Sequence, residues 1–227
     1  MAVHVSAQAS FRRGATGIEL ILATWLICLT ALSPAPTQAA PTYDHHPVVR
    51  HSAGQMANFS RECARYASQG IDVQECVRQA AIARHATAKY RDFRAALADG
   101  FLPTGECEQT AAGAMGQHWA RMDRMAIDGI APRTPELLLY LPSGPGFELV
   151  GVEYEESARA GGLPYYGNSP PDQSKVSPAP VMFGGRTFNG PMQGHIAIQP
   201  WHYDLHAWLW QRNPSGLFAQ YNPDLSC

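Results

Sequence analysis

Histidine side chains gather near the C-terminus of this chain, at a spacing that suits a shared metal ion. His202 and His206 are four residues apart in a tryptophan-rich segment, and His195 lies shortly before it. Two neutral imidazoles at this separation can bind one divalent transition metal. Further upstream, His118 and Glu153 supply an imidazole and a carboxylate that would complete the donor set. These residue types predict a metal site at His118, Glu153, His202 and His206.

Zinc, copper and iron are the divalent transition metals that such donors favour, and each would support hydrolytic or oxygen chemistry. Asp204 is placed to orient a ligand histidine through its second ring nitrogen. Two competing interpretations remain open at this point. One is a purely structural core of histidines and tryptophans. The other is a non-catalytic, envelope-associated binding module that presents a Trp-rich surface to a glycan, peptide or small molecule, built from Trp119, Trp201, Trp208 and Trp210.

Other catalytic patterns are missing from the sequence. It contains no Gly-x-Ser-x-Gly elbow for a serine nucleophile and no GxGxxG loop for a dinucleotide. No Cys-x-x-Cys pair occurs, which argues against a thiolate metal site. Metal chemistry on histidine and carboxylate is therefore the leading functional hypothesis.

The segment that carries His202 and His206 is compatible with two secondary structures. In a helix the two histidines lie one turn apart on one face, and in a strand their even spacing puts them on one side. Pro200 before the segment and Asn213-Pro214 after it favour the helix. We therefore predict a C-terminal helix here.

Glu153 belongs to the clearest predicted sheet element. Residues 136–142 and 147–154 are rich in β-prone side chains, and the glycines and proline between them predict a β-hairpin. Residues 161–194 are rich in Gly, Pro, Ser and Asn, and we expect a surface excursion there.

The cysteines predict two disulfides. Helical periodicity over residues 58–69, a stop at Gly70 and a capping box at Asp72 predict a helical hairpin. Cys63 and Cys76 lie at similar distances from its turn, about 10 Å at the helical rise per residue, and can be bridged. Cys107 with Cys227 follows by elimination.

Length and charge exclude several function classes. The chain has 227 residues, with 17 Lys and Arg against 19 Asp and Glu, and a formal net charge of -2. This size fits one ordinary domain. A negative net charge gives no electrostatic attraction to a phosphate backbone, and the sequence has no run of basic residues. We therefore expect no nucleic-acid partner.

The N-terminus is typical of an export signal. Arg12 and Arg13 precede an apolar stretch over residues 18–32, and small residues lead to an expected cleavage site after Ala39. An uncleaved anchor is the alternative interpretation. With cleavage, the mature chain has no membrane span and belongs outside the cytoplasm, either secreted or in the periplasm or cell envelope.

We therefore predict an α+β fold, with an N-terminal helical hairpin followed by a small antiparallel sheet with long loops and a C-terminal helix. The predicted domains are a signal peptide over residues 1–39, a mobile arm over 40–56 and a single α+β domain over 57–227. That domain is expected to be helical over 57–100 and mixed over 101–227.

From Ala80 to Cys227 the sequence resembles a family of exported bacterial proteins of uncharacterised function. The resemblance rests on Met115-Gly-Gln-His118-Trp, Leu149-Val-Gly-Val-Glu-Tyr154, His202-Tyr-Asp-Leu-His206-Ala-Trp-Leu-Trp210, and the following Asn213-Pro-Ser-Gly-Leu-Phe218 and Asn222-Pro223. It implies no particular activity. It does imply that His118, Glu153 and His206 are recurring polar positions, whereas His202 varies.

Overall fold

The computed structural model describes residues 53–125, 129–195 and 199–227, all within one compact unit. The helices among these residues are α1 (Ala53–Ala64), α2 (Val73–Thr87), α3 (Phe93–Ala98) and α4 (Met122–Met125). Within the same ranges, no helix has the length and apolar character needed to cross a bilayer. The predicted signal over residues 1–39 lies outside the described residues, as do residues 40–52 of the predicted arm.

Helices α1 and α2 are joined through a short 3-10 turn and cross-linked by a disulfide. Gly70 adopts the left-handed conformation with φ 84° that ends the turn. The Asp72 carboxylate then caps α2 by accepting hydrogen bonds from the backbone N–H groups of Gln74 and Glu75. The Cys63–Cys76 bridge and the Cys107–Cys227 bridge are both present, which confirms the predicted pairing.

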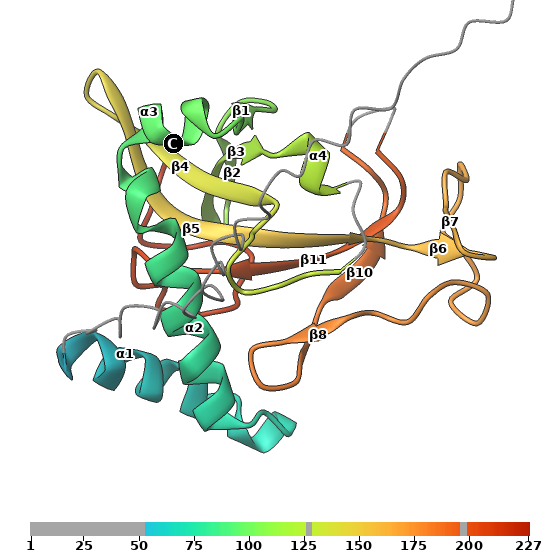
Figure 1. Ribbon diagram of the computed structural model, residues 1–227, viewed down its shortest axis with the longest axis horizontal. Helices are drawn as coiled ribbons and strands as arrows, with labels where there is room; N and C mark the ends of the chain where they lie inside the picture. Colours follow the sequence, from blue (N-terminus) through green and yellow to red (C-terminus); the bar gives the residue numbers. More distant parts are fainter. Residues whose placement is uncertain (1–52, 126–128, 196–198) are drawn as a thin grey trace, which may run out of the picture. The chain divides into compact units, whose positions relative to one another are not determined.

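An antiparallel sheet of seven strands forms the centre of the described part of the chain (Figure 1). Its order is β1 (Leu102–Pro103), β3 (Gly113–Ala120), β4 (Leu137–Ser143), β5 (Gly146–Ser157), β11 (His202–Ala207) and β10 (Asn189–Met192), and β2 (Glu108–Thr110) also pairs with β3. Two small hairpins stand beside it, made by β6 (Arg159–Ala160) with β7 (Leu163–Pro164) and by β8 (Val181–Met182) with β9 (Arg186–Thr187). Ser143 pairs with Gly146, which confirms the predicted β4–β5 hairpin.

This architecture overturns the predicted fold class. The sheet is not small, and the segment predicted as a C-terminal helix is strand β11, which pairs with β5 from His202 through Ala207. In this segment Tyr203, Leu205 and Ala207 alternate with polar residues, and all six positions are buried between β5 and β10. Pairing on both sides satisfies the backbone of a buried strand, and this outweighs the helix-boundary signal of Pro200.

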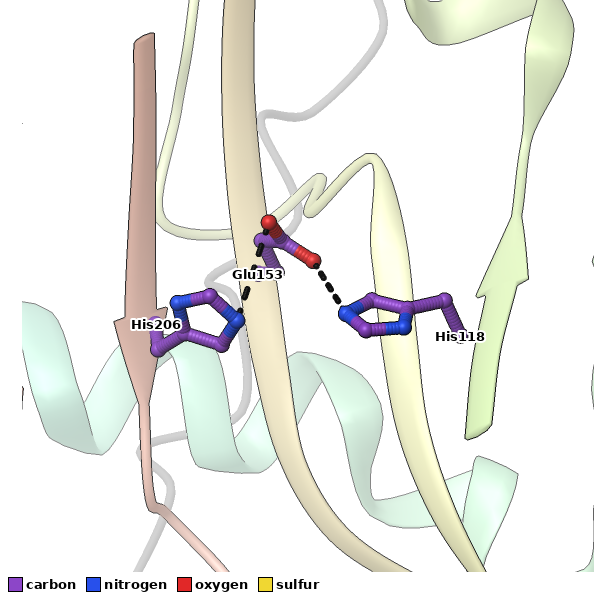
Figure 2. Close-up of side chains that lie close together, drawn as sticks. All are labelled: His118, Glu153 and His206. Carbon is purple, nitrogen blue, oxygen red and sulfur yellow. Dashed lines mark ion pairs between the residues drawn. The ribbon is translucent and has the colours of Figure 1, made fainter. Parts of the chain in front are cut away.

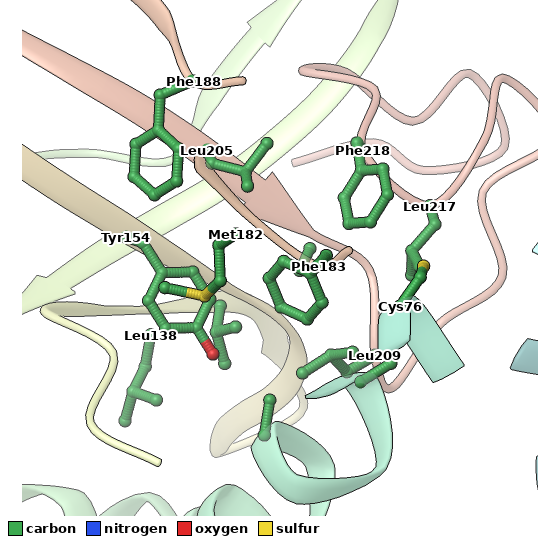
Figure 3. Close-up of a cluster of buried hydrophobic side chains, with 14 of the residues drawn as sticks. Cys76, Leu138, Tyr154, Met182, Phe183, Phe188, Leu205, Leu209, Leu217 and Phe218 are labelled. Atoms are coloured by element: carbon green, nitrogen blue, oxygen red, sulfur yellow. The ribbon is translucent and has the colours of Figure 1, made fainter. Parts of the chain in front are cut away.

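One face of the sheet carries the main hydrophobic core. Leu138, Val152, Tyr154 and Leu205 are buried there, and the helices contribute further side chains to the same cluster (Figure 3). Alternate residues along a strand point to opposite faces, so the residues between these apolar positions face the other way. The second face is the polar one, and it carries the candidate site.

The glycine- and proline-rich segment over residues 161–194 is more than the predicted surface excursion. Phe183 is fully buried and its ring packs against those of Tyr154 and Phe218, with centroids 5.6 and 5.2 Å away (Figure 3). Strand β10, in the same segment, pairs with β11. The segment therefore adds a side chain to the core and a strand to the sheet. The low hydrophobicity of its sequence did not indicate either role.

Candidate metal centre

Three polar side chains from three strands meet on the polar face. His206 of β11 stands directly opposite Glu153 of β5. On the other side of Glu153, Leu137 of β4 pairs with Ala120 of β3, and His118 lies two residues before Ala120 on the same face. The sheet register thus brings together residues that are far apart in sequence.

The side chains of these residues point toward one another, with the Glu153 carboxylate between the two imidazoles (Figure 2). His118 Nε2 is 3.2 Å from Glu153 Oε2, and His206 Nε2 is 3.7 Å from Glu153 Oε1. One donor atom from each residue lies within 4.8 Å of the other two. Two nitrogens and one oxygen at such separations could hold one metal ion, because ligand bonds of about 2.1 Å place neighbouring donors a little over 3 Å apart.

Some donor atoms of this cluster have no hydrogen-bond partner among the described residues. Glu153 and His206 are 3% and 1% exposed, and both ring nitrogens of His206 are buried without a hydrogen bond, whereas Glu153 Oε2 has the ion pair with His118. Leaving a buried polar atom unpaired costs about 1–3 kcal/mol. A bound cation would remove that cost for one nitrogen of His206.

The outer nitrogen of each histidine faces a second carboxylate. His118 Nδ1 is 3.7 Å from Glu108 Oε1, and His206 Nδ1 is 3.8 Å from Asp204 Oδ2. The other oxygen of Asp204 accepts a hydrogen bond from Asn189 Nδ2 at 3.2 Å. A carboxylate behind a metal-binding imidazole fixes its tautomer and raises its basicity.

The protonation states of the three side chains suit metal binding. Burial opposes ionisation of Glu153, but the imidazoles of His206 and His118 lower its pKa to about 2. Burial lowers the pKa of His206, so its ring is neutral near pH 7. Burial also lowers the pKa of His118, but Glu153 and Glu108 outweigh this effect and raise it overall. The cluster therefore contains a carboxylate, one neutral imidazole and one that a metal ion would deprotonate.

Several further buried carboxyl groups lie around this cluster. Burial and the charge of Glu153 raise the pKa of Glu155 to about 8 and that of Asp204 to about 7. Burial raises the pKa of Glu136 to about 8. Among the described residues, every ion pair found for Glu153, Glu155 and Asp204 is with a histidine. Within the described ranges, no Lys or Arg forms an ion pair with these three carboxyl groups, and a metal ion would add positive charge beside them.

A cavity of about 550 Å³ opens beside the cluster. His118 and Glu153 are part of its lining, as is Glu155, while residues 104–108 and helix α4 contribute to its walls. This volume falls in the range of small-molecule sites. A metal held by two imidazoles and one carboxylate retains open coordination positions, and the cavity gives a ligand access to them.

His202 lies on the same face but outside the three-residue cluster. Its Nδ1 is 3.2 Å from the carbonyl oxygen of Pro200, and its buried Nε2 has no hydrogen-bond partner in the described residues. Its ring centroid is 5.4 Å from that of His195. The structure thus brings together three of the four predicted ligands and leaves His202 beside them.

The tryptophans do not form an exposed platform. Trp119, Trp201 and Trp208 are 2%, 7% and 3% exposed. The half-buried Trp210 is stacked under the guanidinium of Arg84, 4.0 Å from the ring centroid. This burial removes the surface on which the predicted aromatic binding module depends.

Sequence reasoning missed two carboxylates of the site. Glu155 is two residues after Glu153 on β5, so the two side chains point to the same face of the sheet. Its position on the polar face could therefore have been predicted together with the hairpin. Glu108 had no comparable signal, because it comes from a three-residue strand whose pairing with β3 places it near His118.

Comparison of the chain with family models, curated proteins and solved structures gives no significant match.

Proposed function

We propose that this is an exported protein that binds one divalent transition metal through His118, Glu153 and His206. Zinc, iron and copper all accept two imidazoles and a carboxylate. With open positions facing the cavity, such a metal supports hydrolytic or oxygen chemistry on a bound small molecule. The residues of this chain hold the ion, orient its ligands through Glu108 and Asp204, and shape the cavity.

One observation carries this proposal. Both ring nitrogens of His206 are buried and without hydrogen-bond partners among the described residues, and Nε2 lies 3.7 Å from Glu153 Oε1. Buried polar atoms in folded proteins nearly always have partners, so two unpaired nitrogens beside a carboxylate point to a missing ligand. A structural core of histidines and tryptophans would pair these nitrogens, and here the tryptophan N–H groups bond elsewhere.

Two disulfides support the export part of the proposal. Disulfides persist in oxidising compartments and are rare in the cytosol, and the N-terminal sequence is typical of an export signal.

The test is metal analysis and thermal melting of protein purified without an affinity tag. Metal at about 100 times its Kd should stabilise the fold by about 2.7 kcal/mol, or roughly 5 to 10 °C in Tm for a domain of this size. His206→Ala and Glu153→Gln should abolish this shift. The matched control is His85→Ala, because His85 is exposed on α2, away from the cluster, and its shift should equal that of the wild type.

The readout is the metal-induced shift and not Tm itself, so a variant that changes basal stability remains informative. The proposal would be refuted if the Tm of the wild-type protein did not change on addition of zinc, iron or copper. A His206→Ala variant that keeps the full shift would refute it as well.

A further inference from the structure

A second cavity, of about 320 Å³, shares no lining residue with the cavity beside the metal cluster. Its walls come from helix α1, from Arg84 of α2 and from the segment that follows β11. Its described lining residues include two arginines, Arg84 and Arg212, and no aspartate or glutamate. We call it the arginine cavity.

Arg84 is a half-buried cation without an acidic partner among the described residues. Its Nη1 donates a hydrogen bond to the backbone carbonyl of Leu209, and its guanidinium lies 4.0 Å from the ring centroid of Trp210. A carbonyl group and an aromatic ring compensate part of the lost hydration, but neither carries a negative charge. The other nitrogens of the guanidinium have no hydrogen bond within the described ranges, so they remain available to a ligand.

Other arginines add positive charge around Arg84. The guanidinium carbon of Arg91 is 5.7 Å from the centroid of the same Trp210 ring, and Arg61 Nη2 donates to Oδ1 of the lining residue Asn58 at 3.2 Å. Burial and the charge of Arg91 lower the pKa of Arg84. In the part of the chain that the structure describes, the ion pairs found for arginine and lysine involve none of these three arginines.

The carboxylate of Glu148 lies near the arginine cavity but does not neutralise this charge. Glu148 is exposed, and its Oε1 accepts a hydrogen bond from Gln211 Nε2 at 2.9 Å. It forms no ion pair with Arg84, and the exposed Arg212 has none with any described residue. The arginine cavity therefore has an excess of positive charge, although the net charge of the whole chain is -2.

The backbone of the arginine cavity is fixed by hydrogen bonds. The N–H groups of Trp210 and Gln211 both donate to the carbonyl of Val150, at 3.2 and 3.1 Å. The Asn222 side chain holds the next residue, because its Nδ2 donates to the carbonyl of Arg212 at 2.9 Å. Walls that are already in place bind a ligand with little cost of loop ordering.

We propose that the arginine cavity binds a small organic oxyanion, a phosphate or a carboxylate, through the guanidinium groups of Arg84 and Arg212. A guanidinium is planar and donates parallel hydrogen bonds that match the oxygens of such groups. The volume lies at the lower end of the range for small-molecule sites, so the anionic group has room for a small organic part. The inference does not depend on the metal site.

The test titrates three probes, glycerol phosphate, glycerate and glycerol, which share a small polyol part and differ in the anionic group. Metal-free protein in about 0.1 M sodium chloride is used, so that no probe coordinates a metal and weak surface attraction is screened. The indole N–H signal of Trp210 reports the arginine cavity. Both anions should shift this signal and bind at least about tenfold more tightly than glycerol. The tighter of the two identifies the preferred anionic group.

Two variants locate the binding. Arg84→Gln should weaken binding of the preferred anion at least about tenfold, and Arg212→Gln, which changes an exposed side chain, at least about threefold. Arg212→Gln keeps the test decisive if Arg84→Gln does not fold. The matched control is Arg78→Gln, which also removes one positive charge from α2 but from an exposed arginine paired with Glu75, and it should alter affinity less than about twofold.

Equal binding of glycerol and of the two anions would overturn the inference. An anion affinity that Arg212→Gln leaves unchanged would overturn it too. Neither result bears on the metal site, because none of its proposed ligands lines the arginine cavity. A protein that binds no metal would likewise leave the oxyanion site standing.

Discussion

Glu153 and His206 face each other directly across the β5–β11 pair, with Oε1 and Nε2 3.7 Å apart. Directly opposed residues on antiparallel strands have Cβ atoms about 5 Å apart, so their side chains meet whatever the surrounding loops do. His118 reaches the same carboxylate from β3, on the other side of β4. The rigid part of the fold therefore positions all three side chains.

Glu108 should matter for metal affinity although it is not a ligand. Its carboxylate faces the outer nitrogen of His118, and loss of such a partner weakens metal binding by about 10- to 100-fold. We expect Glu108→Gln to lower zinc affinity in a competition assay with a chromophoric chelator. Glu106→Gln, on the same segment, should leave it unchanged. Equal affinities of the two variants would contradict the orienting role.

The Cys107–Cys227 disulfide should affect the metal site, whereas Cys63–Cys76 should not. Cys107 lines the cavity and precedes Glu108, so opening this bridge frees the residue behind His118. Either double Cys→Ser variant should lose about 2–4 kcal/mol of stability. At a temperature where both variants are folded, only the first should bind zinc more weakly. A matching loss in the Cys63–Cys76 variant would show that general destabilisation is the cause.

The metal-free protein should become less stable as pH rises from 6.5 to 8. Burial raises the pKa of Glu136 to about 8 from 4.5, so in this window the folded state binds a proton that the unfolded state has lost. Stability falls where the folded state binds more protons, here by about 1–2 kcal/mol for each such carboxyl group. Glu155, with a similar pKa, contributes in the same direction.

Urea denaturation at several pH values measures this slope. Glu136→Gln should flatten the slope, because glutamine keeps an oxygen for the Glu155 N–H and does not titrate. Stability that rises over the same window would contradict the assignment.

The apolar and polar faces of the sheet should be separable by mutation. Phe183→Ala removes a fully buried ring between Tyr154 and Phe218 and should cost about 3–5 kcal/mol of unfolding free energy. Zinc affinity of the folded variant should stay within about twofold, because the ring lies on the face opposite the cluster. Isothermal titration of zinc into this variant, alongside chemical denaturation, measures both quantities.

Sequence reasoning could reach the residues of the site more easily than their arrangement. Local signals were sufficient for the β4–β5 hairpin and for the cap at Asp72, because turn residues and caps act over a few positions. The segment over residues 201–210 was ambiguous, since helical and extended spacing both place His202 and His206 on one side. The segment is a strand because it is buried between β5 and β10, and both of these strands lie far from it in the sequence or follow a long loop.

The same limit explains the details of the cluster. His118 meets Glu153 only because β3 and β5 both pair with β4 in one register, and no property of either sequence segment encodes that register. Phe183 escaped notice because the few aromatic residues in this glycine- and proline-rich stretch follow no helical or strand periodicity.

Because the three donors of the proposed site come from strands β3, β5 and β11, they come together only when the sheet has formed, and a metal ion would bind them only then. The cation acquired would then be decided by what is available where folding ends.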